Sequence, residues 1–431
     1  MAEIDPSSLL NEPALSIEPP AHPCSGRVTL PGSKSITNRA LLLAGLARGR
    51  SRLTGALKSD DTRHMATALR QMGVGVDEPD GTTFVVEGRG GLGMSATPLF
   101  LGNAGTAVRF LTAAAATVAA ETILDGDDHM RRRPIGPLIE ALGRMGVDAV
   151  APSGCPPVTV RGPLTGGGEV IVDARLSSQY LSALLMAAPL AQAATTFRLS
   201  DARIGAQGYV DLTLAAMRAF GAMVTRIDAG AWRVEPGPYR ARDYRIEPDA
   251  SAATYLWGVE ALTGGAVDIG LANADFTQPD AAAHAMIAAF PNMPAVIDGS
   301  QMQDAVPTLA VLAMFNAAPV RFVGIANLRV KECDRIAALA TELQRLHPDL
   351  AREEGDDLIV TPVPDLAASI RPGAIQTYHD HRIAMAFALA GLRLRGITIL
   401  DPGCVAKTYP GYWRTLRSLG VVLTPAPAFS A

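Results

Sequence analysis

The feature that most constrains the fold of this 431-residue chain is a short phrase that recurs along it. Four copies read as the end of a helix, a glycine and the start of a strand, at residues 69–74, 142–147, 217–222 and 416–421. A glycine directly after a helix commonly adopts the left-handed conformation that ends it. Two degenerate copies, at 286–291 and 343–348, carry proline instead. A repeat of about 70 residues predicts six supersecondary units, each with about two helices and several strands.

Six units in one chain predict two domains of three units each. We place the second division near Tyr244–Pro248, after the third unit. A short strand at Arg27–Leu30 precedes the first unit and is expected to complete the C-terminal half. Domain I then comprises residues 1–31 and 246–431, and domain II residues 32–245. The two chain crossings make a hinge, and a ligand site is expected in the cleft between the domains.

Two further expectations concern the parts outside the regular pattern. Residues 1 to about 26 contain three prolines near their end and are interpreted as a mobile arm. The interval between the fourth and fifth helix stops is short, which indicates that the fourth unit has lost a strand or loop around residues 290–298.

Composition excludes several classes of protein. Hydrophobic residues make up 48% and charged residues 19% of the chain, as in a globular protein, and the net charge of −4 attracts no nucleic acid. The four cysteines form no CxxC pair, which indicates reduced thiols with neither a zinc site nor a disulfide framework. The N-terminus lacks the apolar core of a signal peptide, and no apolar run of about 18 residues indicates a membrane span. We therefore expect a cytoplasmic protein.

Domain II carries cations beside small and hydroxyl residues at expected helix starts. Residues 31–39 read PGSKSITNR, and residues 99–113 contain the glycine-rich turn Gly102–Thr106 followed by Arg109. Helix N-termini bind anions, and Thr106 is a candidate cap, although a tight structural turn explains the same glycines. In the run Arg131–Arg133, Arg133 is best held because Pro134 follows it, whereas such runs are usually solvated. Ser177 and Ser178 open another helix, as caps or as phosphate donors.

The C-terminal half repeats this pattern. Residues 327–335 read NLRVKECDR, where a helix would place Lys331 and Arg335 on one face. Asp304 precedes an apolar helix, and it is either a helix cap or a carboxylate able to take a hydroxyl proton. Residues 379–382 read HDHR, but no third ligand follows at a useful spacing, so we expect no metal. Local clusters of cations in both halves favour a substrate pair that bears phosphates and carboxylates.

These phrases together resemble the 5-enolpyruvylshikimate-3-phosphate synthases (3-phosphoshikimate 1-carboxyvinyltransferases). The resemblance covers nearly the whole chain from about Arg27 and rests on nine motifs in order: PGSKSITNRALLLAGLA, SDDTRHM, LFLGNAGTAVRFLTA, RRRPIGPL, SSQYLSALLMAAPL, EPDASAATY, NLRVKECDR, YHDHRIAMAFAL and AKTYPGYW. It implies an α/β fold of two inside-out α/β domains, each of three βαβαββ units, with the active site in the inter-domain cleft. It also implies a monomeric enzyme without metal or organic cofactor.

The implied reaction transfers the enolpyruvyl group of phosphoenolpyruvate to the 5-hydroxyl of shikimate 3-phosphate and releases phosphate, by addition and elimination. By motif, the resemblance assigns the proton transfers to Lys34, Asp304 and Glu332. It assigns phosphoenolpyruvate to Lys34, Gly105, Arg133, Gln179, Arg335, Arg382 and Lys407. It assigns shikimate 3-phosphate to Lys34, Ser35, Arg39, Ser177, Ser178, Gln179, Asp304, Asn327 and Lys331.

The chain departs from the family pattern at two positions. Where well-known members read Ser-Lys-Pro-Tyr, it reads Ala206-Gln207-Gly208-Tyr209, so a serine that helps to hold the shikimate phosphate is absent. The lost hydrogen bond would cost about 1.5–3 kcal/mol unless a neighbour compensates. Phe110 replaces a frequent proline. The alternatives are therefore a modified shikimate or UDP-N-acetylglucosamine as acceptor, or an inactive binding protein on the same scaffold. The sister enzyme that uses UDP-N-acetylglucosamine usually has a loop cysteine, and none lies near residues 131–136 here.

Overall fold

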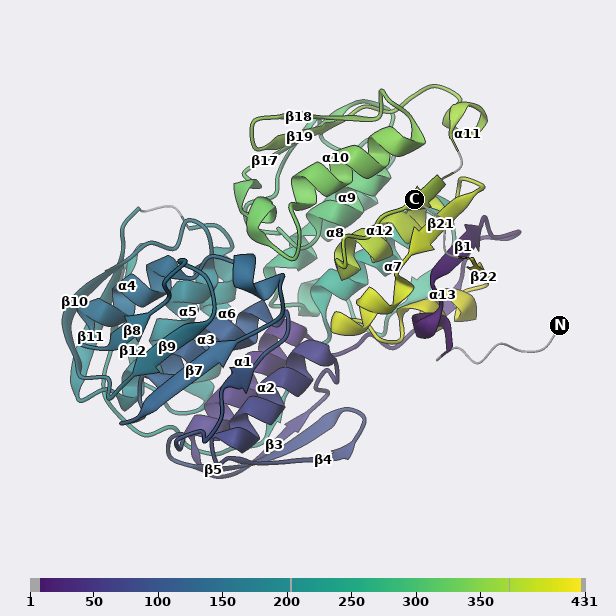
Figure 1. Ribbon diagram of the computed structural model, residues 1–431. Helices are drawn as coiled ribbons and strands as arrows, with labels where there is room; N and C mark the ends of the chain where they lie inside the picture. Colours follow the sequence, from purple (N-terminus) through teal and green to yellow (C-terminus); the bar gives the residue numbers. More distant parts are fainter. Residues whose placement is uncertain (1–7, 202–203, 372, 428–431) are drawn as a thin grey trace. The chain divides into compact units, whose positions relative to one another are not determined.

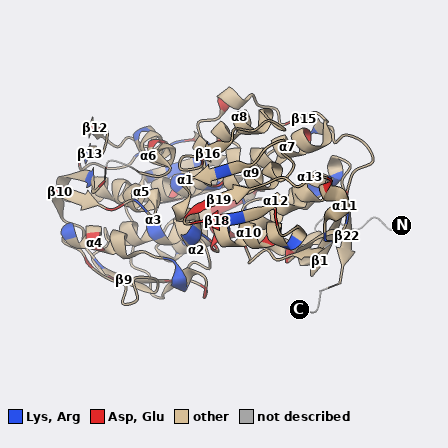
Figure 2. Ribbon diagram, turned by 90° about the horizontal axis from the view of Figure 1, so that it is seen from above, with Lys and Arg blue, Asp and Glu red and all other residues tan. Residues whose placement is uncertain are grey.

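The computed structural model describes residues 8–201, 204–371 and 373–427 (Figure 1). The chain divides into two compact units, and each is described by itself. Unit 1 comprises residues 1–30 and 249–431, and unit 2 residues 31–248. The expected divisions after residues 31 and 245 lie close to these. Both units are mixed α/β structures, with acidic and basic residues distributed over each (Figure 2).

Unit 2 contains three four-stranded sheets with one common plan. In each sheet the first two strands are parallel, and the remaining neighbours are antiparallel. The sheets, in spatial order, are β14 (Tyr244–Arg245), β3 (Arg48–Thr54), β5 (Thr83–Arg89) and β4 (Gly75–Asp80); β6 (Leu99–Phe100), β7 (Glu121–Asp125), β9 (Val158–Arg161) and β8 (Asp148–Val150); and β10 (Gly166–Val172), β11 (Ala193–Leu199), β13 (Ala231–Val234) and β12 (Val224–Asp228).

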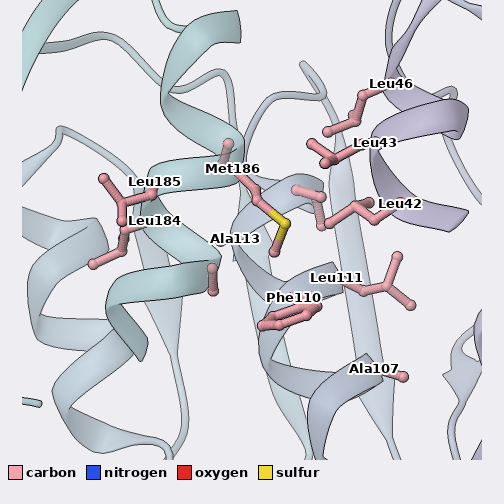
Figure 3. Packing of buried hydrophobic residues seen from close by; sticks show 14 of the residues in the cluster. Leu42, Leu43, Leu46, Ala107, Phe110, Leu111, Ala113, Leu184, Leu185 and Met186 are labelled. Carbon is pink, nitrogen blue, oxygen red and sulfur yellow. The ribbon is translucent and has the colours of Figure 1, made fainter. Parts of the chain in front are cut away.

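Each of these sheets is associated with one buried and one amphipathic helix. The buried helices are α1 (Lys34–Leu46), α3 (Gly105–Ala115) and α5 (Ser178–Ala187), whose apolar side chains pack together (Figure 3). The amphipathic helices are α2 (Asp60–Gln71), α4 (Gly136–Arg144) and α6 (Gln207–Ala219). A helix that is apolar on all sides must be buried, which explains why α3 has no exposed residue.

The helix-stop prediction is confirmed at all four glycines. Gly73, Gly146, Gly221 and Gly420 each have φ between 80° and 92°. The conformation costs little at glycine because it has no Cβ. The repeat in the sequence is therefore a repeat of helix ends in the structure.

Unit 1 follows the same plan in two of its three sheets. These are β16 (Val296–Asp298), β17 (Val320–Val323), β19 (Asp357–Val360) and β18 (Ala351–Glu354); and β20 (Gly373–Ile375), β21 (Ile397–Leu400), β1 (Ala14–Glu18) and β22 (Val422–Ala426). The third is a parallel pair, β15 (Val267–Asp268) with β2 (Gly26–Arg27). The buried helices are α7 (Ala250–Thr263), α9 (Val306–Ala313) and α12 (His381–Ala390), and the others are α8 (Ala283–Ala288), α10 (Arg335–Leu346), α11 (Leu366–Ser369) and α13 (Tyr412–Ser418).

The expected mobile arm is wrong for the described residues from 14 onward. Strand β1 lies between β21 and β22, antiparallel to both, and Ala14, Leu15 and Ile17 are fully buried. The alternation of apolar and half-buried residues in Ala14–Glu18 is a strand pattern, which the prolines around it obscured. The N-terminal segment therefore completes unit 1.

The fourth unit is shortened, as its short interval indicated. In the described chain, α8 is followed directly by β16, without the antiparallel pair that precedes the next unit elsewhere. Its sheet is the two-stranded β15–β2 pair for this reason. Strand β2, at Gly26–Arg27, also replaces the strand expected at Arg27–Leu30.

The two ends of unit 2 are joined to each other. Gly32 forms an antiparallel bridge with Pro248, and the Ser33 amide donates to the Glu247 carbonyl at 2.8 Å. A side chain at Gly32 would overlap the Gly55 carbonyl oxygen, so this approach requires glycine. The start of α1 is thus fixed at the base of this bridge.

Candidate active site

The first group of predicted residues lies at the start of α1 in unit 2. Ser33 is the N-cap, and its side chain accepts from the Ile36 amide at 3.4 Å. Lys34 follows in the first turn, is 8% exposed and lies 3.5 Å from the carboxylate of Asp61. Because Asp61 is buried as well, it limits the positions that the Lys34 ammonium can adopt. Sequence reasoning did not assign Asp61, although it belongs to the SDDTRHM motif.

Arg39, one turn further along α1, points into the interior of unit 2. Its Nε donates to Thr213 Oγ1 at 2.7 Å and its Nη1 to the Ser35 carbonyl at 2.9 Å. The rings of Phe110 and Tyr209 lie 5.0 and 5.9 Å from its guanidinium carbon. Burial lowers the pKa of Arg39 to about 10. The nearest contacts of this cation are therefore neutral groups.

The glycine-rich turn before α3 holds the side chain of Arg133. Arg133 Nη1 donates to Asn103 Oδ1 at 3.0 Å, and a Cβ on Gly105 would lie 2.7–2.8 Å from the Arg133 guanidinium atoms. Gly105 is therefore needed for Arg133 to lie over the turn. Arg131 and Arg132 are exposed whereas Arg133 is 7% exposed, as the adjacent Pro134 indicated. The expectation that Thr106 caps α3 is wrong, because the N-cap is Ala104 and no side chain caps the helix.

Gln179 connects α5 to this turn. Its Oε1 accepts from Arg109 Nη1 at 2.7 Å, and its Nε2 lies 3.4 Å from Thr106 Oγ1. Arg109 also donates to the Pro134 carbonyl, and this second bond holds the guanidinium in place against Gln179. Ser177 is the N-cap of α5 and accepts from the Gln179 amide at 3.3 Å, while Ser178 begins the helix.

Unit 1 brings six charged side chains into one network, which we call the acid–cation cluster. Arg335 is at its centre, with Nη1 3.0 Å from Asp304, Nη2 2.7 Å from Glu332 and Nε 2.7 Å from Asp380. Arg382 Nη2 lies 2.7 Å from the second oxygen of Asp304, and Lys407 Nζ lies 3.7 Å from Glu332. The cluster comprises Asp304, Glu332, Arg335, Asp380, Arg382 and Lys407.

The elements around the cluster explain how it forms. Asp380 is the N-cap of α12, where it accepts from the Arg382 amide at 2.9 Å, and Arg335 begins α10. Asp304 does not cap α9, whose N-cap is Ala305, so the capping interpretation of Asp304 is wrong. Lys407 ends the 3₁₀ turn η7 (Pro402–Lys407). Helix starts and turn ends are thus the places where these side chains converge.

The charges of the cluster hold its arginines fully ionised. Burial alone would lower the pKa of Arg335, but Asp380, Glu332 and Asp304 more than offset it, so the pKa is raised. Burial opposes the charge of Arg382 in the same way, and Asp304 chiefly raises its pKa. With three carboxylates and three cations, each buried charge of the cluster has an opposite charge beside it.

Two predicted residues lie on the segment before α10. Asn327, in the 3₁₀ turn η6 (Ala326–Val330), is 8% exposed, and its Oδ1 has no hydrogen-bond partner within the described chain. Lys331 was expected one helical turn before Arg335 on a common face, and this is wrong. The Asp334 side chain caps α10 by accepting from the Ala337 amide at 3.0 Å, so the helix begins only at Arg335.

Asp380 is the member of the cluster that sequence reasoning missed. It lies in the HDHR phrase, where the histidines drew attention as candidate metal ligands. No group of three or more metal-ligating side chains occurs among the described residues. All four cysteines are free thiols. The position of Asp380, between two histidines and two residues before Arg382, was the sequence signal that could have identified it.

The structure therefore places the predicted residues in two sets, one in each unit. Lys34, Arg39, Gly105, Arg133 and Gln179 belong to unit 2, with Ser35, Ser177 and Ser178. Asp304, Glu332, Arg335, Arg382 and Lys407 form the cluster of unit 1, and Asn327 and Lys331 lie on the segment that leads to it. Among the described residues, no helix is long and apolar enough to span a membrane.

Comparison with known proteins identifies the family. The family model for EPSP synthase (3-phosphoshikimate 1-carboxyvinyltransferase) matches residues 19–416. The chain belongs to the EPSP synthase family. It is 64% identical over 410 residues to 3-phosphoshikimate 1-carboxyvinyltransferase of Rhizobium leguminosarum bv. trifolii, covering 94% of this chain and 97% of the relative. The enzyme of that name from Pseudomonas syringae pv. syringae is also 64% identical, with 94% and 98% covered.

Solved structures of EPSP synthases and their relatives share the fold. The EPSP synthase of Acinetobacter baumannii matches with a TM-score of 0.76 at 25% identity, covering 95% of this chain and 99% of the other. The enolpyruvyl transferase NikO from Streptomyces tendae matches with a TM-score of 0.72 at 18% identity, covering 96% and 100%. The second likeness supports the fold alone.

Proposed function

We propose that this chain transfers the enolpyruvyl group of phosphoenolpyruvate to the 5-hydroxyl of shikimate 3-phosphate and releases phosphate. The observation that carries the proposal is the 64% identity, over 94% of the chain, to enzymes named 3-phosphoshikimate 1-carboxyvinyltransferase. The acid–cation cluster supplies what such a transfer needs: cations for a phosphate and carboxylates that accept a proton.

The cluster suggests which residues accept a proton and which bind phosphate. The 5-hydroxyl must lose a proton as it attacks, and the leaving phosphate must carry away additional negative charge. We assign the acceptance of a proton to Asp304 and Glu332. Each contacts a cation that would otherwise bind phosphate: Asp304 contacts Arg335 and Arg382, and Glu332 contacts Arg335 and Lys407. Phosphate binding would therefore free both carboxylates as it recruits the cations.

Lys34 completes the proposed catalytic set. Its ammonium is held beside Asp61 and can donate a proton to the methylene carbon or stabilise negative charge nearby. We assign phosphoenolpyruvate to Lys34, Gly105, Arg133, Gln179, Arg335, Arg382 and Lys407. We assign shikimate 3-phosphate to Lys34, Ser35, Arg39, Ser177, Ser178, Gln179, Asp304, Asn327 and Lys331.

The missing serine at position 206 bears on the acceptor. Ala206 precedes α6 with φ 58° and ψ 46°, is 3% exposed and provides no side-chain cap. We expect Ser177, Ser178 and Gln179, at the start of α5, to provide the principal polar contacts of the acceptor phosphate. The expected cytoplasmic location and monomeric state are part of the same proposal.

Phosphate release tests the proposal. Purified protein is incubated with phosphoenolpyruvate alone, shikimate 3-phosphate alone, both together, and phosphoenolpyruvate with UDP-N-acetylglucosamine, without added metal. We expect release only with phosphoenolpyruvate and shikimate 3-phosphate together. Release that requires UDP-N-acetylglucosamine, or no release in any mixture, would overturn the proposal.

A further inference from the structure

Arg39 differs from the arginines of the acid–cation cluster in having no carboxylate beside it. Arg335 contacts three carboxylates, whereas no ion pair of Arg39 occurs in the described chain. Arg39 is only 2% exposed, so the cation is removed from water without an internal counter-charge. An isolated buried charge is costly, and hydrogen bonds must compensate for it.

The neutral partners account for nearly all the donors of the Arg39 guanidinium, which has five N–H groups. Nε donates to Thr213 Oγ1, one Nη1 hydrogen to the Ser35 carbonyl, and Nη2 to the Tyr209 carbonyl at 3.2 Å and Ser182 Oγ at 3.5 Å. The second Nη1 hydrogen has no acceptor in the described chain. Because a guanidinium is planar and rigid, the groups that hold its other edges determine where this hydrogen points.

Thr213 makes the shortest of these contacts, at 2.7 Å, and joins three helices. It lies on α6, receives the Nε hydrogen of Arg39 on α1, and lies 3.0 Å from Ser182 Oγ on α5. Its own hydroxyl hydrogen has two possible acceptors, Ser182 Oγ and the Tyr209 carbonyl at 2.9 Å. All of these hydroxyl groups are buried, with Thr213 and Ser182 at 0% exposure. The guanidinium lies over the Phe110 ring, so its hydrogen bonds restrain its rotation within its plane, and the bond to Thr213 is the shortest of them.

We propose that Thr213 is a positioning residue of the acceptor site, whose hydroxyl holds the Nε edge of Arg39 and so directs the remaining Nη1 hydrogen toward the acceptor's carboxylate. This inference rests on the proposed function, in which Arg39 binds shikimate 3-phosphate. Thr213 itself touches no substrate in this account. Its effect therefore belongs to the binding of one substrate and not to the chemical step.

Steady-state kinetics of Thr213→Val and Thr213→Ser test the proposal, after the wild type has been shown to be active. Valine keeps the shape of threonine but accepts no hydrogen bond, whereas serine keeps the hydroxyl. We expect Thr213→Val to raise the KM for shikimate 3-phosphate roughly tenfold, as for one charge-assisted hydrogen bond. The KM for phosphoenolpyruvate and kcat should stay within about twofold of wild type, and Thr213→Ser should restore most of the lost affinity.

Thr112→Val is the matched control. Thr112 is fully buried on α3 in the same unit, and its hydroxyl has no hydrogen-bond partner in the described chain. The control should leave both KM values unchanged. The inference is overturned if Thr213→Val leaves the KM for shikimate 3-phosphate unchanged, raises both KM values equally, or is not rescued by serine.

A double-mutant cycle separates positioning of Arg39 from a general loss of structure. Lysine at position 39 has no Nε–H edge to hold, so Thr213→Val should change the KM for shikimate 3-phosphate much less in the Arg39→Lys background. An undiminished effect there would overturn the inference. If Thr213→Val does not fold, Thr213→Cys, which has a weaker acceptor of similar size, takes its place with the same expectations. Inactivity of the wild type would instead contradict the proposed function.

Discussion

Individual contacts decide which of the predicted residues are available to a substrate. Arg133, Arg39 and Arg335 are all buried arginines, yet Arg133 lies over a glycine turn, Arg39 among neutral groups and Arg335 among three carboxylates. Sequence motifs identified all three but could not distinguish these environments. The partners come from distant parts of the chain, as with Arg39 and Thr213, and no local pattern encodes such pairing.

Gly105→Ala should weaken phosphoenolpyruvate binding without unfolding the protein. The added Cβ would lie 2.7–2.8 Å from the end of the Arg133 side chain, which can move away more easily than backbone. We expect the KM for phosphoenolpyruvate to rise roughly tenfold, as for one displaced charged contact, and the melting temperature to change little.

Gly136→Ala is the control for this substitution, because a Cβ there meets nothing within 4 Å. Its kinetics should match the wild type. An unchanged KM for phosphoenolpyruvate in Gly105→Ala would contradict the role given to Arg133.

Asp304→Asn should reduce kcat by roughly 10²–10⁴-fold, the range for loss of a general acid or base. The amide keeps the shape of the side chain but cannot take the hydroxyl proton, and it removes the negative charge between Arg335 and Arg382. Asp334→Asn is the matched control, because Asp334 caps α10 and pairs with Arg329 outside the cluster. Steady-state assays in which both variants keep wild-type kcat would refute the assignment of Asp304.

At the scale of elements, the sequence predicted the regular parts well and the irregular parts poorly. The glycine stops determined where helices end, because glycine at a left-handed position is a local requirement. The start of α10 was misplaced because Asp334, and not the spacing of Lys331 and Arg335, determines where that helix begins. Strand β1 was missed because its partners, β21 and β22, lie almost the whole chain away.

Ile17→Ala tests whether the N-terminal strand is integral to unit 1. Ile17 is fully buried, and its side chain would contact a Cβ placed on Gly391. We expect a loss of about 2–5 kcal/mol in the free energy of unfolding, measured by urea denaturation. Ser16→Ala, which removes only the bond to Thr398 Oγ1, should cost about 0.5–1.5 kcal/mol. Equal and negligible losses would support the mobile arm instead.

At the scale of the whole molecule, buried ionisable groups make stability depend on alkaline pH. Burial raises the pKa of Tyr255 and Tyr409 to about 12, and it raises the pKa of Tyr239 and Tyr412 well above the ordinary value. Above about pH 10 the unfolded chain loses phenolic protons that the folded protein retains, so stability falls as pH rises. Arg39 acts in the opposite direction over the same range, because its pKa is lowered in the fold. Because four tyrosines lower the stability and one arginine raises it, the net effect of these groups is a loss of stability.

We therefore expect the free energy of unfolding to decline as the pH rises, beginning near pH 9 because burial also raises the pKa of Cys333 and Cys404, and continuing between roughly pH 10 and 12. Urea denaturation across this range measures it, and Tyr409→Phe should make the decline shallower by removing one titrating group. A stability that is constant or rises above pH 10 would contradict this account.

The sequence repeat predicted six units in two halves, and membership of the EPSP synthase family indicates the activity of the whole chain. We expect this chain to join the enolpyruvyl group to the 5-oxygen of shikimate 3-phosphate. Carbon NMR of the reaction with phosphoenolpyruvate labelled at its methylene carbon tests this activity. We expect the label to appear as a vinyl methylene on a new enol ether at the 5-oxygen, with one phosphate released for each. Label that remains in phosphoenolpyruvate, or a labelled enolpyruvyl group attached to any other oxygen, would contradict this activity.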